Sequence, residues 1–541
     1  MPHWTVPDTA DRTLGKLLRS QAETLGDADY LIFDEDRYSF SRTNELANSL
    51  AAGFARLGVG PGTAMHCYLE NSADFVLISF ALAKLGAVCI TTNTAFKDEF
   101  LLRTFTQGGA DYVVVDESLA ANVGRIWDRY RFGTVVIRGA ATDQAGLFPG
   151  ARIEDLRSLY LDTTAEPAGL ESVAHSDTAT VQWTSGTTGL PKGVMQSHNL
   201  WIVSGDYMAR NRDVIESDVI YNTMPMYQSG AWIMNLYPGL IAGVPVACDP
   251  VFSVSEFWDR CRHYGATQMF TLGAMHIYLW QRPSRPDDRD NPVRSGCCIP
   301  MPAALYEPFK ERFGIEYLSE GLGQSECMPY SMTDRSRPRW KPNSAGLVRE
   351  GLEVKVLDEQ DREVPVGSPG EICVRPLDPY TIFSGYWRDP AATANSWRNL
   401  WYHSGDLGRV DEDGEMFFVD RKADFMRYKG RNISSFEVES VVARHPAVYE
   451  VAAHAVPAEE LASEDEVKIV VVLKAGVVAT AEELAGFVND HAPYYMVPRY
   501  IEFADDMPHT PTGRVEKYKL RALGNGDRTW DRDAAGFVVT R

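Results

Sequence analysis

Strand-like runs that alternate with helical patterns fill the first part of this chain of 541 residues. Residues Glu45–Leu57 favour a helix that ends before Gly58, and residues Phe75–Leu85 favour a second helix. The apolar runs Ala87–Thr92 and Asp111–Val115 have the composition of strands. Strands separated by helices favour a parallel sheet, because a helix between two strands can bring the chain back to the end of the sheet where the first strand began. The sequence therefore predicts an α/β protein.

The pattern changes between residues 345 and 420. Short strands at Val354–Leu357, Glu371–Arg375 and Glu415–Val419 are separated by acidic turns, which indicates a small antiparallel β-barrel or meander. Helices and strands mix again after residue 422, with a helix predicted at Ala481–His491. Since one core cannot serve a chain of this length, we expect a large N-terminal domain (residues 1–421) of parallel α/β sheets plus the small β-barrel, and a small α+β C-terminal domain (residues 422–541).

Charge and composition exclude several classes of protein. The net charge of −21 disfavours nucleic acid and anionic membranes as partners, because both require a basic surface. Eight scattered cysteines without metal-ligand spacing indicate a reduced, cytoplasmic compartment, with most of them serving as small buried residues. The N-terminus lacks the pattern of a signal peptide. The longest apolar run, Phe75–Ile90, contains Lys84 and is interpreted as a buried helix and strand, not as a membrane span.

The segment Thr184–Gly193 follows the strand-like run Thr178–Trp183. Its three glycines let backbone N–H groups approach an anion, its hydroxyls add donors, and Lys192 adds a positive charge. This composition predicts a loop that grips phosphate. Its spacing differs from GxxxxGK[ST], so a kinase or an ordinary P-loop ATPase is not expected. A polar surface turn is the alternative interpretation.

Further motifs follow this loop in a fixed order: Gly321–Glu326, Trp401–Asp406, Asp420–Arg421, Gly430–Glu439 and Pro508–Leu520. Together with the loop, they resemble the adenylate-forming superfamily of acyl-CoA ligases, non-ribosomal peptide adenylation domains and luciferases, over nearly the whole chain. The resemblance implies a C-terminal domain on a hinge that rotates between two half-reactions. The first makes an acyl adenylate from an acid and ATP, and the second transfers the acyl group to a thiol such as CoA.

The resemblance also implies a role for each matching residue. The residues expected to grip phosphate are Thr184, Ser185, Gly186, Thr187, Thr188, Gly189 and Lys192. Gly323, two residues before Ser325 in the same motif, would help to bind the nucleotide. Ser325 would contact phosphate or carboxylate oxygens, and Glu326 would hold Mg²⁺, a cation that prefers oxygen ligands. Asp406 would accept both ribose hydroxyls of AMP, with Arg421 nearby. Gly430 would line the channel for the pantetheine arm of CoA.

The acyl group is less constrained. Four residues are expected at the acyl site by their position in the motif order: Tyr227, Gln228, Trp232 and Cys298. The segment 227–232 contains no Asp that could bind an α-amine, and Trp232 and the cysteines favour an apolar acyl chain or ring system. A homodimer is common in this class, but no segment specifies an interface.

The chain departs from the family pattern at several positions. Arg514 replaces the lysine that serves adenylation, and a planar guanidinium does not substitute for a compact ammonium at a crowded site. Leu322 stands where a tyrosine stacks on adenine, and Cys297–Cys298 stand where glycines leave room beside the nucleotide. Gln228 replaces a histidine near the acyl group. Ala423 occupies a hinge position that is usually Asp or Lys.

These departures affect adenylation and leave the thiolation residues intact. We therefore predict an acyl-CoA ligase that makes acyl-CoA from an acyl adenylate and CoA, with weak or absent use of ATP. A separate adenylating enzyme would then supply the adenylate. In this respect the chain resembles a non-adenylating ligase of platensimycin-type diterpenoid biosynthesis, a natural product pathway.

Three alternatives stay open. The chain is a complete ATP-dependent acyl-CoA synthetase if Arg514 works adequately, or if Lys517 or Lys519 replaces the missing lysine. In the second alternative, it transfers the acyl group to a carrier protein and not to free CoA. This is disfavoured because no carrier domain follows the lysine motif. In the third, it is a catalytically inactive relative that binds adenylate or CoA, and the intact phosphate loop and Glu326 argue against this.

Overall fold

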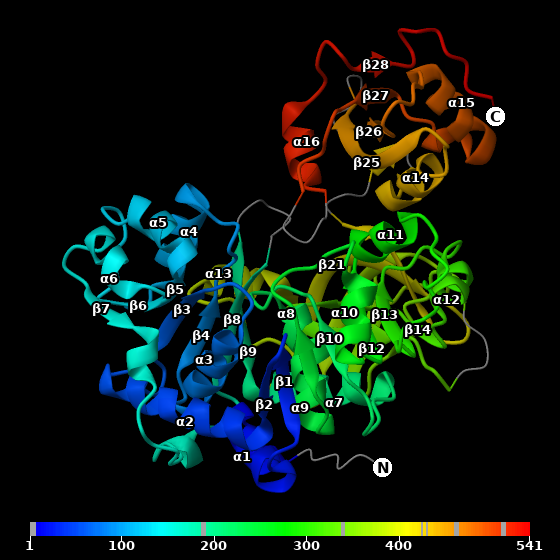
Figure 1. Cartoon of the computed structure of the whole chain (residues 1–541). Coiled ribbons are helices and arrows are strands. Elements are labelled where there is room, and N and C mark those ends of the chain that lie inside the picture. The colour runs from blue at the N-terminus through cyan, green and yellow to red at the C-terminus, as the bar shows by residue number, and fades with distance from the viewer. Residues whose placement is uncertain are drawn as a thin grey trace. The chain divides into compact units, whose positions relative to one another are not determined.

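The computed structural model describes residues 7–184, 191–336, 341–422, 426–428, 431–458, 465–509 and 515–540. The chain divides into two compact units (Figure 1). Unit 1 contains residues 1–186, 190–354 and 374–402, and unit 2 contains residues 187–189, 355–373 and 403–541. The boundary expected between residues 421 and 422 stays a prediction.

Two seven-stranded sheets form the framework of unit 1. The first has the order β7 (Arg152–Asp155), β6 (Thr134–Arg138), β5 (Tyr112–Asp116), β3 (Ala64–Tyr68), β4 (Val88–Thr91), β8 (Thr178–Thr184) and β9 (Lys192–Ser197). The second has the order β14 (Tyr317–Ser319), β13 (Ser295–Ile299), β12 (Gln268–Leu272), β10 (Ile220–Asn222), β11 (Val246–Cys248), β1 (Asp29–Phe33) and β2 (Asp36–Ser39). Neighbouring strands are parallel except for the edge pairs β8–β9 and β1–β2. This confirms the predicted parallel α/β architecture.

Helices cover both faces of these sheets (Figure 1). The largest core cluster joins the two sheets through α1 (Leu14–Leu25), α2 (Phe40–Arg56), α3 (Ala73–Lys84), α7 (His198–Asn211) and α9 (Tyr237–Ala242). On the outer faces, α4 (Asp98–Gly108) and α5 (Glu117–Arg125) pack on the first sheet, and α10 (Phe257–Tyr264) and α12 (Tyr306–Phe313) pack on the second. Both faces of the central strands are therefore buried, which explains their continuous apolar runs.

The two-residue period of a strand decides which core each side chain enters. In β5, Val114 faces the core between the sheets, whereas Val113 and Val115 face the outer core. In β13 the two cysteines divide in the same way, because Cys297 enters the shared core and Cys298 the outer core of the second sheet. All eight cysteines are free and buried, as predicted for small core residues.

Smaller elements complete unit 1. They are η1 (Thr9–Asp11), α6 (Ala141–Gln144), η2 (Ala145–Leu147), η3 (Leu156–Leu159), η4 (Leu170–Ser172), α8 (Ser229–Ala231), the π-helix η5 (Trp232–Leu236), α11 (Ala274–Gln281), β15 (Gly321–Gln324), β16 (Cys327–Met332), β17 (Leu347–Val348), α13 (Pro390–Ser396) and β20 (Trp397–Arg398). Strands β18 (Leu352–Leu357), β19 (Gly370–Pro376) and β21 (Trp401–Val410) each begin in one unit and end in the other.

Unit 2 is an α+β structure. Its remaining elements are β22 (Met416–Arg421), β23 (Met426–Tyr428), β24 (Arg431–Ile433), α14 (Ser435–Val442), β25 (Val448–Pro457), β26 (Asp465–Leu473), α15 (Ala481–His491), η6 (Tyr494–Met496), β27 (Tyr500–Phe503), α16 (Lys517–Leu523) and β28 (Trp530–Asp531). Strands β25 to β28 form a sheet in sequence order, and α14 and α15 contribute to its core cluster. No helix in the described parts of either unit is long and apolar enough to cross a membrane.

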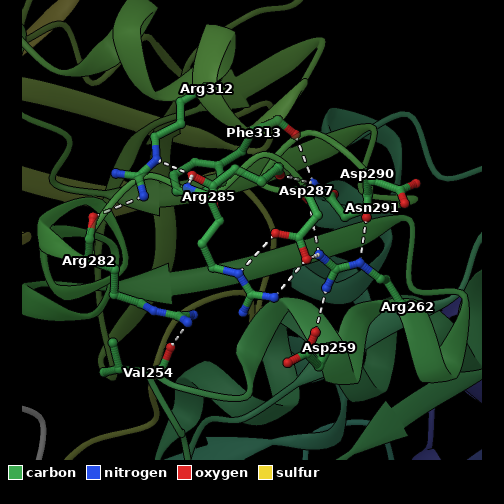
Figure 2. A network of polar contacts seen from close by, with 11 residues as sticks. Val254, Asp259, Arg262, Arg282, Arg285, Asp287, Asp290, Asn291, Arg312 and Phe313 are labelled. Carbon is green, nitrogen blue, oxygen red and sulfur yellow. Dashed lines mark hydrogen bonds and ion pairs between the residues drawn. The ribbon is translucent and has the colours of Figure 1, made fainter.

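A polar network fixes the irregular segment that follows α11 (Figure 2). The Arg312 guanidinium donates to the carbonyls of Trp280 (2.6 Å) and Arg282 (3.0 Å), and to the carboxylate of Asp288 (2.7 Å). A cation at the C-terminal end of a helix satisfies its last carbonyl groups and interacts favourably with its dipole. Arg262 holds the other end of the segment through the carbonyl of Asp290 (2.6 Å).

We expect Gly108→Ala to destabilise unit 1. A Cβ at Gly108 would lie 2.1 Å from Nε2 of His66, which is fully buried beside Phe105. Overpacking of this kind costs about 1–3 kcal/mol and outweighs the gain in helix propensity. Urea unfolding measures the loss. Gly146→Ala is the control, because a Cβ there meets open space; equal midpoints for the two variants would contradict the packing at Gly108.

Candidate functional site

The predicted phosphate loop follows β8 in the sequence and precedes β9, the edge strand of the first sheet. Thr184 pairs with Lys192 in the antiparallel register, and the Thr184 hydroxyl lies 3.5 Å from the Lys192 carbonyl oxygen. Gly193 stands opposite Trp183, where an added Cβ would lie 3.2 Å from the indole ring. The two ends of the loop are therefore held side by side at the end of β8. The predicted phosphate-binding residues Ser185, Gly186, Thr187, Thr188 and Gly189 lie outside the described residues, and their roles stay predictions.

Lys192 and Glu326 come together through Tyr386. The Lys192 ammonium lies 5.0 Å from the centre of the Tyr386 ring, a cation–π distance, and the Tyr386 hydroxyl donates to Glu326 Oε1 at 2.8 Å. Glu326 is buried, with 7% of its surface exposed. Burial and the adjacent Glu326 carboxylate raise the pKa of the Tyr386 phenol well above its usual value, so it stays a neutral donor. Sequence reasoning missed Tyr386.

The backbone around Tyr386 is attached to β9. The Trp387 amide donates to the Gly193 carbonyl (2.7 Å), and the Met195 amide donates to the Gly385 carbonyl (3.0 Å). The same segment also contacts the turn at Glu326, because the Phe383 amide donates to the Glu326 carbonyl (2.8 Å). This segment thus links the start of β9 to the turn that carries Glu326.

Ser325 and Glu326 form the two-residue turn between β15 and β16, whose flanking residues Gln324 and Cys327 pair with each other. Gln324 Oε1 accepts from the Tyr402 hydroxyl at 2.7 Å. Gly323 lies close to the opposite strand, since an added Cβ would lie 3.0 Å from Pro329 Cα. The predicted motif is therefore a tight hairpin that directs its polar turn toward Tyr386.

A second polar network surrounds Ser325. The Ser229 hydroxyl lies 3.0 Å from the Ser325 hydroxyl and hydrogen-bonds to the Gln182 side chain. Gln196 donates to the Ser325 carbonyl (2.9 Å) and accepts from the Thr180 hydroxyl (2.8 Å). Thr180, Gln182 and Gln196 were not identified from the sequence, and Ser229 was included only within the segment 227–232 expected near the acyl group. The alternation of polar side chains in β8 at positions 180, 182 and 184 was the available signal.

The predicted acyl-site residues occupy different environments. Gln228 precedes α8, and Tyr227 is largely buried, which raises the pKa of its phenol to about 12. Trp232 begins the π-helix η5, is 2% exposed, and donates its indole N–H to the Met226 carbonyl (2.6 Å). Cys298 is fully buried, 3.2 Å from the Thr271 hydroxyl. Trp232 and Cys298 are core side chains in this structure, and the acyl-site role of all four stays a prediction.

In unit 2, Asp406 and Arg421 form an ion pair across β21 and β22. They are partners in the antiparallel register, and Arg421 Nε lies 2.7 Å from Asp406 Oδ1. Asp406 is 2% exposed, and its backbone N–H donates to the Ser404 hydroxyl (3.0 Å). The predicted closeness of Arg421 to Asp406 is thus present in the structure.

Another network joins β22 to α14 and α16. Asp420 accepts hydrogen bonds from the Ser435 backbone N–H and from the Ser434 hydroxyl (3.2 Å). Lys517 donates to the Ser435 hydroxyl (2.6 Å) and forms an ion pair with Glu439 Oε1 (2.7 Å). Burial raises the pKa of Glu439, and the Lys517 ammonium opposes this shift. Gly430, Arg514 and Ala423 lie outside the described residues, so their predicted roles are untested.

Comparisons with known proteins agree with this arrangement. The model of the AMP-binding enzymes matches residues 18–387, and that of the AMP-binding enzyme C-terminal domain matches residues 437–514. The chain belongs to the AMP-binding enzyme family. Its relatives include the crotonobetaine/carnitine–CoA ligase of Salmonella paratyphi C (strain RKS4594), which is 28% identical over 518 residues. The aligned region covers 97% of that ligase and 92% of this chain. This confirms the predicted adenylate-forming class and an acyl-CoA ligase type of enzyme.

Solved structures share the fold. The anthranilate CoA ligase AuaEII, in complex with anthranoyl-AMP, superposes with a TM-score of 0.82 at 21% identity, covering 97% of this chain and 98% of that ligase. A benzoate CoA ligase from Burkholderia xenovorans LB400 also reaches a TM-score of 0.82, at 22% identity and with 94% and 99% coverage. These neighbours confirm the large N-terminal domain of parallel sheets and the smaller C-terminal domain.

We predict that Tyr386→Phe weakens binding of Mg²⁺–ATP about tenfold, because a hydrogen bond to a charged group contributes about 1.5 kcal/mol. Titration of the nucleotide at fixed Mg²⁺ measures the change. Tyr160→Phe is a matched control, since its hydroxyl also donates to a carboxylate at 2.8 Å, that of Asp74. Equal affinities of the two variants would contradict the role of Tyr386.

We expect Lys517→Met to lower the thermal midpoint of unit 2, because it leaves the Glu439 carboxylate without its ammonium partner, at a cost of about 1–3 kcal/mol. The folded-state pKa of Glu439 is raised, so its charged form disfavours the fold. The loss is therefore greater at pH 8 than at pH 5, where protonation relieves it. Lys519→Met is the control, since Lys519 is 45% exposed beside Glu516. A loss that does not depend on pH would contradict this account.

Proposed function

We propose that this protein forms an acyl-CoA thioester from an acyl adenylate and CoA. The observation that carries the proposal is the Lys192–Tyr386–Glu326 arrangement, which lies where β8 ends and β9 begins. A positive charge at the mouth of a glycine-rich loop suits the phosphate of an adenylate, and preorganised charge of this kind supplies much of the stabilisation in acyl transfer. In unit 2, the buried Asp406 offers acceptor oxygens for ribose hydroxyls.

The reaction requires little from the protein beyond binding and electrostatics. The CoA sulfur attacks the acyl carbonyl carbon, a C–S bond forms, and the bond from that carbon to the AMP oxygen breaks. AMP leaves with the bonding electron pair, and the thiol proton passes to solvent. In this proposal Lys192 stabilises the negative charge that develops on the leaving AMP. The acyl group is an apolar chain or ring system. Glu326 would hold Mg²⁺, which would offset the negative charge of the ATP phosphates.

In this proposal, the protein converts an acyl adenylate to acyl-CoA faster than it makes an adenylate from an acid and ATP. Arg514 takes the place of the adenylation lysine, and the two lysines nearest in sequence already have partners. Lys517 is paired with Glu439 and 15% exposed, and Lys519 is paired with Glu516. Moving either ammonium to a nucleotide would leave a carboxylate unpaired, which is costly for the largely buried Glu439. This supports the separate supply of acyl adenylate by another enzyme.

Two parallel assays of one preparation test the proposal. The first supplies an aromatic or alicyclic acid with Mg²⁺–ATP and CoA, and the second supplies the corresponding acyl adenylate with CoA. We expect acyl-CoA from the second assay at a rate at least 100-fold higher, since misplacing a charge by about 1 Å costs on the order of 100-fold. Comparable rates would identify a complete ATP-dependent synthetase, and no acyl-CoA in either assay across a panel of acids would contradict the proposal.

Arg514→Lys separates the two half-reactions. The variant restores a compact ammonium, so we expect it to raise the ATP-dependent rate at least tenfold while leaving the rate from acyl adenylate within about twofold. Arg521→Lys, in α16, is the control for a general effect of replacing an arginine with lysine in the C-terminal part of the chain. A rise in both half-reactions, or in neither, would contradict the assignment of the defect to Arg514.

A further inference from the structure

Unit 2 contains a buried group of three chemically different side chains on two strands. Glu371 and Cys373 are two residues apart in β19 and therefore lie on the same face, and His403 comes from β21. The Cys373 Sγ lies 3.3 Å from His403 Nδ1, and Glu371 Oε2 lies 3.1 Å from the same nitrogen. The exposed fractions of the Glu371, Cys373 and His403 side chains are at most 9%. One ligand atom from each residue lies within 4.8 Å of the other two.

These separations approach those of a tetrahedral metal site. With Zn–S of about 2.3 Å, and Zn–N and Zn–O of about 2.0–2.2 Å, tetrahedral angles place sulfur about 3.5 Å and oxygen about 3.4 Å from the nitrogen. The observed distances of 3.3 Å and 3.1 Å are shorter by 0.2–0.3 Å. Thiolate, imidazole and carboxylate are the ligands that Zn²⁺ takes, whereas Mg²⁺ prefers oxygen alone.

The other side of the imidazole supports the same assignment. His403 Nε2 is buried and has no hydrogen-bond partner among the described residues, and Asp361 Oδ1 lies 3.8 Å from it. A metal ion on Nδ1 would leave the ring N–H on Nε2, the nitrogen that lies nearest to Asp361. Metal-bound histidines commonly direct their other N–H to a carboxylate in this way.

We propose that Glu371, Cys373 and His403 bind a Zn²⁺ ion, with the fourth position taken by water. Binding replaces the Cys373 thiol proton, which is released to solvent, so one proton leaves for each ion bound. Lys422 Nζ lies 2.9 Å from Glu371 Oε2 and opposes the incoming cation, so this ammonium sets the affinity of the site.

Glu371 and its neighbour Ile372 also form hydrogen bonds with β21, the strand that carries Asp406. Glu371 Oε1 accepts from the Gly405 backbone N–H (3.2 Å), and the Ser404 hydroxyl donates to the Ile372 carbonyl (2.6 Å). An ion bound by Glu371, Cys373 and His403 would cross-link β19 and β21 directly before Asp406. It is separate in chemistry from the Mg²⁺ expected at Glu326, because its donor set includes sulfur and nitrogen.

Competition with a chromophoric chelator tests the proposal on the metal-free full chain. We expect one Zn²⁺ bound per chain, with the affinity reduced at least 100-fold in Cys373→Ser and in His403→Gln. Co²⁺ in place of Zn²⁺ should give a thiolate charge-transfer band in the near ultraviolet, which Cys373→Ser abolishes. Absence of stoichiometric Zn²⁺ binding, or a Co²⁺ spectrum without that band, would overturn the proposal.

Two further variants test whether Zn²⁺ binds at Glu371, Cys373 and His403 and not elsewhere. His263→Gln disrupts the exposed group of Asp34, Glu35 and His263, and should leave the stoichiometric binding unchanged. Loss of Zn²⁺ binding in this variant would place the ion on the surface and overturn the proposal. Lys422→Met, whose side chain is half exposed, serves if the ligand variants do not fold. Removing its ammonium should raise the Zn²⁺ affinity several-fold, and an unchanged affinity would also overturn the proposal.

Discussion

The antiparallel pairing of β8 with β9, at the edge of an otherwise parallel sheet, is the constraint on which the candidate site depends. The reversal places Thr184 and Lys192 opposite each other, at the same end of the sheet. It also makes β9 an edge strand whose backbone groups are available to a second segment. The residues around Tyr386 use those groups, through bonds to Gly193 and Met195, and thereby position the hydroxyl that contacts Glu326.

Burial gives these polar contacts their strength. Glu326 in unit 1 and Asp406 in unit 2 are both nearly inaccessible to water, and each has a specific partner, the Tyr386 hydroxyl and the Arg421 guanidinium. Charges in such surroundings are screened much less than on the surface. The net charge of −21 does not by itself exclude a small anionic ligand, because the field of a nearby cation such as Lys192 acts locally and distant surface carboxylates are screened.

The sequence predicted local structure well wherever short-range signals decide it. The helix α15 has the predicted bounds, Ala481–His491, because Thr480 and Glu483 form a capping box at its start. The helix α2 begins at Phe40, five residues before the predicted start, because Ser39 caps it by accepting from the Arg42 backbone N–H. Tyr386 and Gln182 were not predicted, since their partners lie 47 or more residues away in the chain and no local pattern connects them.

By itself, the sequence determined the α/β class, the adenylate-forming family and the order of the motifs, because hydrophobic periodicity and local residue chemistry are written along the chain. Only the tertiary structure decided which side chains meet. Pairing across β8–β9 and β21–β22 brings together residues that are separated in the sequence. Those that become buried require a partner for their charge, because an unpaired buried charge is costly. For the same reason, only the structure showed that Lys517 is paired with Glu439, and that Glu371, Cys373 and His403 lie around one point.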